Sequence, residues 1–505
     1  MRHARLWPLG VALAGALAVW AGGAPGGVVA LAAVSEAERL WVVGARAFDD
    51  GLYDVAYREL GRFAERAPTD PRRGDATFLR GKAAYALGRY LEALAEFQAG
   101  EGVPLQVATP GEPIFWQGES LFRLKRVEEA SARYALFLQR YPKSPYVADA
   151  LYSKGFADLE LGRGEDASAS FSQLLQDYPK SERTGPATYT LARELVRQKR
   201  WADALPLLAS FSARYPGSPY LAEVRYLLGL TQIETGRPGD GVRTLEQYIA
   251  SDPRSDVVPT ARLYVAEAQA KAGRLQAALD QYQTLVRTTP AHPLAPQALY
   301  QIGDVSVRLG RPADAEAAWT RLRREFPQDP NAGPAGIGLA GLYLKRRQWD
   351  AAREVARAVA DEGGAERTPA LLLWGESALQ ARRPEEAEQA YGRVVAESNA
   401  DSPDRYRALA GLALVAEYQK APSTAREVYQ QIAVGASDPE LVRWAKGRLL
   451  ALDSGEATAS GHVAPAREGT PPRDDTAASS TESRARSRPL AHRTSSGSLA
   501  PTAIC

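Results

Sequence analysis

Residues 144–179 read SPYVADALYSKGFADLELGRGEDASASFSQLLQDYP, and this stretch has the pattern of two short helices joined by a tight turn. The pair Ser144-Pro145 is typical of a helix start, because serine caps free backbone N–H groups and proline tolerates the first helical position. Gly162-Arg163 is typical of a helix stop. A second helix then carries Phe171 on its apolar face and ends before Pro179. The stretch therefore predicts a helical hairpin.

The same pattern recurs along most of the chain at a fixed interval. An arginine follows each turn, and seven of these arginines are 37 residues apart: Arg89, Arg126, Arg163, Arg200, Arg237, Arg274 and Arg311. Arg347 and Arg383 continue the column at a spacing of 36.

A small residue recurs in the first helix: Gly44, Gly81, Gly118, Gly155, Ala192, Gly229, Ala266, Gly303 and Gly375. A bulky residue recurs in the second: Phe97, Tyr134, Phe171, Leu208, Leu245, Tyr282, Trp319 and Tyr391. Because glycine inside a helix costs about 1 kcal/mol relative to alanine, the glycine column predicts a close approach of paired helices, filled by the bulky side chain.

These columns resemble the tetratricopeptide repeat, since Gly155, Ala167, Phe171 and Pro179 stand at the relative spacings of that family. The family period is usually about 34 residues, and the extra residues lie in the connections between hairpins. This variant is similar to the repeats of BamD/YfiO-like outer-membrane assembly factors and of YbgF/CpoB-like, Tol-Pal associated proteins. The resemblance covers about residues 35 to 450. It implies an all-α fold, a right-handed α-solenoid of about eleven helical hairpins.

The N-terminal residues have the pattern of an export signal. A basic start at residues 1–5 precedes an uncharged run at residues 6–34, which contains the cleavage-type sequence Ala30-Leu31-Ala32. We expect residues 1–32 to be a signal peptide and the mature chain to be periplasmic, without an integral membrane span. Peripheral association with a membrane is compatible with this expectation. The alternative is an uncleaved N-terminal anchor, because the run is long enough to cross a bilayer.

The composition changes again near the C-terminus. Residues 33–452 carry the repeats, and Pro439 to Leu452 has the pattern of a last helix that closes the stack. From residue 453 to 505 the chain is rich in Ser, Thr, Ala, Pro, Gly and Arg and has no aromatic residue. Such a segment buries too little apolar surface to offset the entropy of ordering it. The sequence predicts a disordered tail at residues 453–505, whose last residue, Cys505, is the only cysteine.

Charge and composition exclude several functional classes. The 62 basic and 60 acidic residues give a net charge of +2, without the basic excess of a nucleic-acid binder. With four histidines and one cysteine, a Cys/His metal site lacks ligands. His292 lies in a connection between hairpins, where a solvated or packing role is expected. Carboxylate pairs such as Glu165-Asp166 follow the turns, as acidic residues at helix N-termini do. We expect no enzymatic activity, no cofactor, no metal and no small-molecule substrate.

The first helices carry the candidate partner-binding residues. An aromatic or large apolar residue stands three positions before the small residue: Trp41, Phe78, Phe115, Tyr152, Tyr189, Tyr226, Leu263 and Tyr300. The position just after the small residue varies: Ala45, Lys82, Glu119, Phe156, Arg193, Leu230, Glu267 and Asp304. Both columns lie on one helix face. We interpret Tyr152, Phe156, Tyr189, Arg193, Tyr226 and Leu230 as a groove for an extended or helical segment of a partner. The alternatives are inter-repeat core for the first column and a solvated face for the second.

Two functions follow from this interpretation. The first is a non-enzymatic periplasmic scaffold that binds other envelope proteins in outer-membrane protein, Tol-Pal or export machinery assembly. The second is a regulatory subunit that modulates a peptidoglycan or exopolysaccharide enzyme through the same groove.

Overall fold

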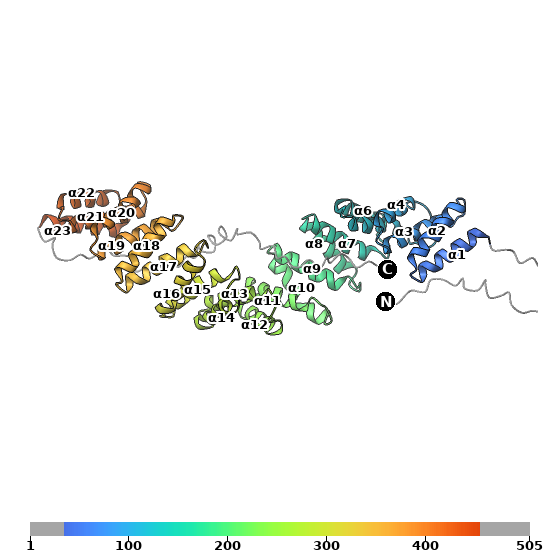
Figure 1. Cartoon of the computed structure of the whole chain (residues 1–505), viewed down its shortest axis with the longest axis horizontal. Helices are drawn as coiled ribbons and strands as arrows, with labels where there is room; N and C mark the ends of the chain where they lie inside the picture. Colours follow the sequence, from blue (N-terminus) through green and yellow to red (C-terminus); the bar gives the residue numbers. More distant parts are fainter. Residues whose placement is uncertain (1–34, 455–505) are drawn as a thin grey trace, which may run out of the picture. The chain divides into compact units, whose positions relative to one another are not determined.

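The computed structural model describes residues 35–454, which form 23 α-helices and no strand (Figure 1). The helices are α1 (Glu36–Asp49), α2 (Tyr53–Arg66), α3 (Arg73–Ala86), α4 (Tyr90–Ala99), α5 (Glu112–Arg123), α6 (Val127–Arg140), α7 (Val147–Glu160), α8 (Gly164–Asp177), α9 (Thr184–Arg197), α10 (Trp201–Arg214), α11 (Leu221–Glu234), α12 (Pro238–Ser251), α13 (Val258–Lys271), α14 (Leu275–Thr288), α15 (Ala295–Arg308), α16 (Pro312–Glu325), α17 (Ala332–Lys345), α18 (Trp349–Glu362), α19 (Arg367–Gln380), α20 (Pro384–Glu397), α21 (Pro403–Tyr418), α22 (Pro422–Gly435) and α23 (Pro439–Asp453).

The helices alternate as first and second members of eleven hairpins, and α23 follows the last. The predicted all-α solenoid of about eleven hairpins is therefore confirmed. The predicted signal peptide, residues 1–32, lies outside the described residues, as does the predicted tail from residue 455 onward. None of the helices between residues 35 and 454 is long and apolar enough to cross a membrane.

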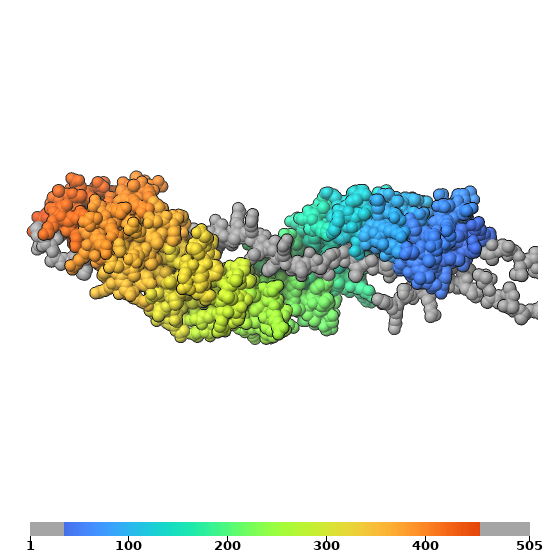
Figure 2. Space-filling view, in the orientation of Figure 1, coloured from blue at the N-terminus to red at the C-terminus, as the bar shows by residue number. Residues whose placement is uncertain are grey.

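The helices fall into two compact units that divide after Gly162. The first unit contains α1–α7 and the second α8–α23. Within each unit, successive helices pack against one another in sequence order. Figure 2 shows the hairpins of each unit as adjoining bands of surface in that order.

Each hairpin turn contains one residue with left-handed backbone. Glycine fills this position in six turns and a basic residue in five: Gly51, Gly88, Lys125, Gly162, Lys199, Gly236, Gly273, Gly310, Arg347, Arg382 and Lys420. The residue after it returns an N–H to the end of the first helix, as Arg237 does to the Gln232 carbonyl at 2.8 Å. This bond satisfies a carbonyl that the helix end would otherwise leave free. The predicted glycine stop is confirmed. Where lysine or arginine takes the place of glycine, its Cβ is strained by the left-handed backbone conformation.

The predicted arginine column needs one correction. Arg347 has φ +57° and so occupies the left-handed position rather than the position that follows it. Gln348 is the residue that precedes α18, which keeps the 37-residue step from Arg311. The shortened step is the next one, from Gln348 to Arg383.

The serines in the connections also act differently from the prediction. Helix α7 begins at Val147, and no side chain caps its first turn. Ser144 instead accepts a hydrogen bond from the Tyr146 N–H at 3.4 Å, and Ser218 accepts one from the Tyr220 N–H at 3.2 Å. Both serines stabilise the turn that precedes the helix, a common role of serine hydroxyls.

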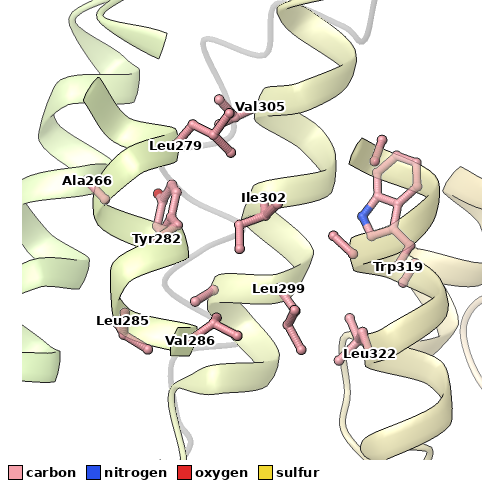
Figure 3. Close-up of a cluster of buried hydrophobic side chains, with 14 of the residues drawn as sticks. Ala266, Leu279, Tyr282, Leu285, Val286, Leu299, Ile302, Val305, Trp319 and Leu322 are labelled. Atoms are coloured by element: carbon pink, nitrogen blue, oxygen red, sulfur yellow. The ribbon is translucent and has the colours of Figure 1, made fainter. Parts of the chain in front are cut away.

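The core is formed where the bulky side chain of a second helix meets the small residue of the first. A Cβ at Gly118 would lie 2.6 Å from the ring of Tyr134, and one at Gly229 would lie 2.6 Å from Leu245. Figure 3 shows Tyr282 of α14 and Trp319 of α16 on opposite sides of α15, which contributes Leu299 and Ile302. The predicted close approach at the glycine column is confirmed.

One second helix departs from the repeat. Helix α4 has 10 residues where the other second helices have 14, and residues 100–111 form a loop before α5. The buried carboxylate of Asp75 accepts N–H groups of Gln106 and Val107 at 2.8 and 3.2 Å, which fixes the loop. A cavity of about 340 Å³ lies between this loop and Tyr141.

Candidate protein-interaction surface

In the first unit, two of the predicted groove residues lie on α7. Tyr152 is buried and Phe156 is half-buried. Their ring centroids are 4.8 Å apart in an edge-to-face arrangement, which is a favourable geometry for an aromatic pair. Only Phe156 of this pair offers appreciable surface.

In the second unit, Tyr189 is a packing residue. Its side chain is 2% exposed, and its ring stacks on Tyr220 with centroids 4.3 Å apart and an angle of 3° between the rings. Burial raises the pKa of the Tyr189 hydroxyl, and a hydrogen bond to Glu223 raises it further. Arg193, one turn later, is exposed. Its guanidinium carbon lies 5.3 Å from the Tyr189 ring centroid, so it covers the ring from the solvent side.

The remaining two predicted residues lie on α11. Tyr226 is half-buried and its ring lies 5.6 Å from that of Tyr248, while Leu230 is buried in the same cluster. Among the six candidates, then, Tyr152, Tyr189 and Leu230 pack between helices, and Arg193 is the most accessible. Their role in binding a partner stays a prediction.

The first-helix face of the first unit carries a polar network that sequence reasoning missed. The Glu112 carboxylate is buried and accepts hydrogen bonds from Trp116 Nε1 at 3.2 Å and from the Tyr146 hydroxyl at 2.8 Å. It also accepts the Thr109 N–H at 3.0 Å and the Lys82 ammonium at 3.4 Å. The ammonium further lies within 6 Å of three aromatic rings, those of Phe48, Phe78 and Trp116.

A second buried carboxylate of this unit, Glu119, is also held by hydroxyl groups. It accepts hydrogen bonds from the Tyr134 hydroxyl at 2.7 Å and the Ser153 hydroxyl at 2.6 Å. Burial raises the pKa of Glu119, and these two hydrogen bonds oppose that shift. In the first unit, therefore, the variable positions Lys82 and Glu119 are both occupied by contacts within the chain.

The corresponding positions of the second unit are more open. Glu267 on α13 is half-buried and accepts one hydrogen bond, from Gln297 Nε2 at 3.0 Å. Burial raises its pKa. Asp304 on α15 forms an ion pair with Arg308 at 3.8 Å, and about half of each side chain is exposed. The next two residues of this column are Gly341 on α17 and Glu376 on α19. The sequence identified the column as variable but did not indicate which members lack partners.

His292 is the only histidine between residues 35 and 454, and it lies in the connection before α15. Between residues 35 and 454, no three His, Cys, Asp or Glu side chains lie close enough together to bind a metal ion. His292 Nδ1 accepts the Leu294 N–H at 3.2 Å and thereby stabilises the turn before α15. This contact agrees with the packing role expected for His292.

Several solved structures are similar to parts of this chain. They include a tetratricopeptide repeat protein from Parabacteroides merdae, with 15% identity over 54% of this chain and 99% of that chain and a TM-score of 0.34. PilF of Pseudomonas aeruginosa has 16% identity over 44% of this chain and 95% of that chain, with a TM-score of 0.33. PilW, described as a widely conserved type IV pilus biogenesis factor, has 19% identity over 45% of this chain and 99% of that chain, with a TM-score of 0.34. A search of curated proteins finds no match.

Family profiles match most of the helical region. A profile of an outer membrane lipoprotein family, YfiO, matches residues 147–251, which contain α7–α12. A tetratricopeptide repeat profile matches residues 44–113, 226–295, 300–366 and 372–440, and a second one matches residues 114–144. The first of these profiles alone covers more than half of the 505 residues. The fold is that of a tetratricopeptide scaffold, a class that binds other proteins and is generally not catalytic, and the chain belongs to the tetratricopeptide repeat family.

Proposed function

We propose that this protein is a non-enzymatic scaffold of the bacterial periplasm that holds together proteins of a cell-envelope assembly or export machine. The match of residues 147–251 to an outer membrane lipoprotein family carries this proposal. The export-signal pattern of residues 1–32 supports the same compartment. The chain has no cysteine near that pattern, so lipid attachment is not part of the proposal.

Binding is assigned to the first helices. Stacked hairpins present successive first helices side by side, and repeat proteins use such a surface to bind extended or helical segments. In the second unit this surface includes Arg193, Asp304 and Val307, which are exposed or half-buried. The second helices supply the aromatic and aliphatic side chains that fill the hairpins, such as Phe211 and Trp319.

Cell fractionation with N-terminal sequencing tests the compartment. The proposal expects the protein in the periplasmic fraction, with a new N-terminus between about Gly22 and Ala33. A protein that retains Met1 and fractionates with the cytoplasm would contradict it. Retention of Met1 in the inner membrane would instead establish the uncleaved anchor, with the repeats still outside the cytoplasm.

A further inference from the structure

Helix α1 exposes an apolar residue at a position that other first helices bury. In later hairpins, the residue just before the small residue packs toward the second helix of the preceding hairpin, as Ile302 of α15 does toward Tyr282 of α14 (Figure 3). On six first helices this residue is at most 7% exposed: Gln117, Leu191, Val265, Ile302, Leu339 and Trp374. Val43 has the same position on α1 and is 44% exposed.

Val42, the residue before Val43, is also exposed. Its exposed fraction is 42%, whereas the equivalent residues of α5 and α11, Trp116 and Leu227, are 2% and 7% exposed. Trp116 is buried because its ring stacks on Phe97 of the preceding second helix, α4, with centroids 6.1 Å apart. Within residues 35–454 no helix precedes α1, so both valines lack this covering. We call Val42 and Val43 the α1 outer face.

The last hairpin, by contrast, is covered by an additional helix. Helix α23 follows it, and the Trp444 ring of this helix lies 5.3 Å from that of Tyr429 on α22 in an edge-to-face arrangement. Ala445 of α23 is fully buried. The end units of a solenoid need such a cap, because their outer faces would otherwise place inter-repeat apolar surface in water. The first hairpin has no cap among the described residues.

The residues that precede α1 have the composition of a cap. Residues 22–34 read GGAPGGVVALAAV, contain no charged side chain and end with seven apolar residues, 28–34. The α1 outer face lies between two exposed arginines, Arg39 and Arg46. An uncharged segment brings no cation toward these arginines, and it can bury the two valines between them.

The segment is also long enough to reach the α1 outer face. Ser35 has ψ 152° and its side chain accepts the Glu38 N–H at 3.1 Å, so the helical path ends at Ser35. The eight residue steps from Ser35 to Val43 rise about 12 Å along α1. Residues 28–34 span about 23 Å when extended. Half of this segment therefore suffices to fold back as far as Val43.

The segment can cover α1 only if export leaves it on the chain. Besides Ala30-Leu31-Ala32, the sequence Val19-Trp20-Ala21 has small residues at both positions that a signal peptidase requires. A cleavage site usually follows an apolar stretch of about 7–15 residues. Residues 6–18, before the earlier site, have this length, whereas residues 6–29, before the later site, exceed it. The length of the apolar stretch favours cleavage after Ala21.

We propose that export removes residues 1–21 and that residues 28–34 then pack on the α1 outer face of the same molecule, as the N-terminal cap of the repeats. This inference rests on the proposed export of the chain. It is narrower than that proposal, because a mature chain that began at Ala33 would lack the cap and would still be periplasmic.

The test combines N-terminal sequencing with photocrosslinking in the full chain. Val43 is replaced by p-benzoylphenylalanine, and the exported protein is purified, irradiated as a dilute monomer and digested for mass spectrometry. We expect an N-terminus at or close to Gly22 and intramolecular adducts between position 43 and residues 28–34. The control position is Leu91, which is 67% exposed on α4. Its yield of adducts with the segment should be at least about tenfold lower, because α1 and not α4 follows the segment directly.

Matched changes in the segment complete the test. Val29→Asn and Leu31→Asn combined should lower the adduct yield from position 43 about tenfold or more, because burial of one such side chain is worth roughly that factor. Gly26→Asn, outside residues 28–34, should leave the yield unchanged. The circular dichroism spectrum should be the same for all three proteins, since none of these changes lies in a helix of the repeats.

Four results would each overturn the proposal. The first is a mature chain that retains Met1 or begins after Val28. The second is a yield at position 43 no higher than at Leu91. The third is a set of adducts that join two molecules or a phospholipid only, since a second copy or a bilayer would then cover the α1 outer face. The fourth is a yield that the two asparagine changes leave unaltered.

Discussion

The indole of Trp319 on α16 lies directly against Gly303 on α15. A Cβ at Gly303 would lie 2.1 Å from Trp319 Nε1, and the same Nε1 donates a hydrogen bond to the Tyr300 carbonyl at 3.1 Å. Equivalent contacts join Gly81 to Phe97 and Gly375 to Tyr391. The glycine column is therefore required by the ring that packs on it, and not by the backbone conformation of the helix.

Replacing Gly303 with alanine tests this contact. We expect Gly303→Ala to destabilise the second unit by about 1–3 kcal/mol, because the indole must move from a well-packed position. Gly392→Ala is the control, since this glycine lies inside α20 with no atom within 4 Å of its Cβ position. That change should stabilise by about 0.5–1 kcal/mol through helix propensity. Urea unfolding followed by circular dichroism gives both values. If Gly303→Ala stabilised the protein as much as Gly392→Ala does, the close contact between Gly303 and Trp319 would be refuted.

The left-handed turn positions make a second prediction. Gly236 has φ +79° and Lys199 has φ +58° at equivalent turns. Gly236→Ala should destabilise by about 1–2 kcal/mol, because a Cβ is unfavourable in this conformation. Lys199→Gly should change stability by less than about 0.5 kcal/mol, since relief of strain is offset by greater freedom of the unfolded chain. A large loss in the lysine variant would show that its side chain, rather than its backbone, matters.

A third prediction separates packing from binding at Tyr189. Tyr189→Ala should cost roughly 3 kcal/mol or more, as removal of a buried aromatic side chain does. The loss should appear as faster hydrogen exchange in α9 and at the start of α11, where Tyr220 precedes the helix. Arg193→Ala should change stability by less than about 1 kcal/mol, because its cation–π contact is exposed. If Tyr189→Ala left exchange unchanged while abolishing partner binding, Tyr189 would be a groove residue.

The pH dependence of the first unit gives a fourth prediction. Burial holds the pKa of Glu119 above its ordinary value of 4.5, so the folded state retains a proton that the unfolded state has already lost. The contribution of Glu119 to the free energy of unfolding is fully present below about pH 4.5. It is lost as the pH rises through the raised pKa of the folded state. Glu119→Gln should flatten this decrease, measured by urea unfolding between pH 5 and 8. Glu65→Gln, at the exposed end of α2, is the control and should keep the slope of the unaltered protein.

The hairpin fold could be predicted because each repeat encodes it locally. The turn, the small residue and the bulky residue lie within about 30 residues of one another and recur in phase. The predictions that were wrong concern residue types that can occupy two different positions in a turn. Arg347 matched the arginine column but occupies the left-handed position, and Ser144 stabilises a turn rather than a helix end. The loop after α4 is held by Asp75, a carboxylate about 30 residues away in the sequence, which the repeat pattern does not indicate.

The interaction surface could be predicted only in part. The sequence placed Glu119 and Glu267 in one variable column, yet their surroundings differ. Glu119 is satisfied by Ser153, which lies 34 residues away, and Glu267 has only Gln297. Such pairings depend on which side chains adjoining repeats bring together, and a repeat pattern does not determine them. For the same reason, the sequence alone could not show which of Tyr152, Tyr189 and Tyr226 are buried in the packing and which are exposed.

Photocrosslinking in living cells tests the central claim, that partners bind the first helices. p-Benzoylphenylalanine is placed at Val307, which is 40% exposed on α15, and in parallel at Thr320, which is exposed on the second helix α16 of the same hairpin. Both are introduced into the full chain. A peptidoglycan or exopolysaccharide enzyme among the adducts would favour the regulatory alternative. We predict adducts with envelope proteins from Val307 and not from Thr320. Adducts from Thr320 alone, or the same adducts from both positions, would contradict the account.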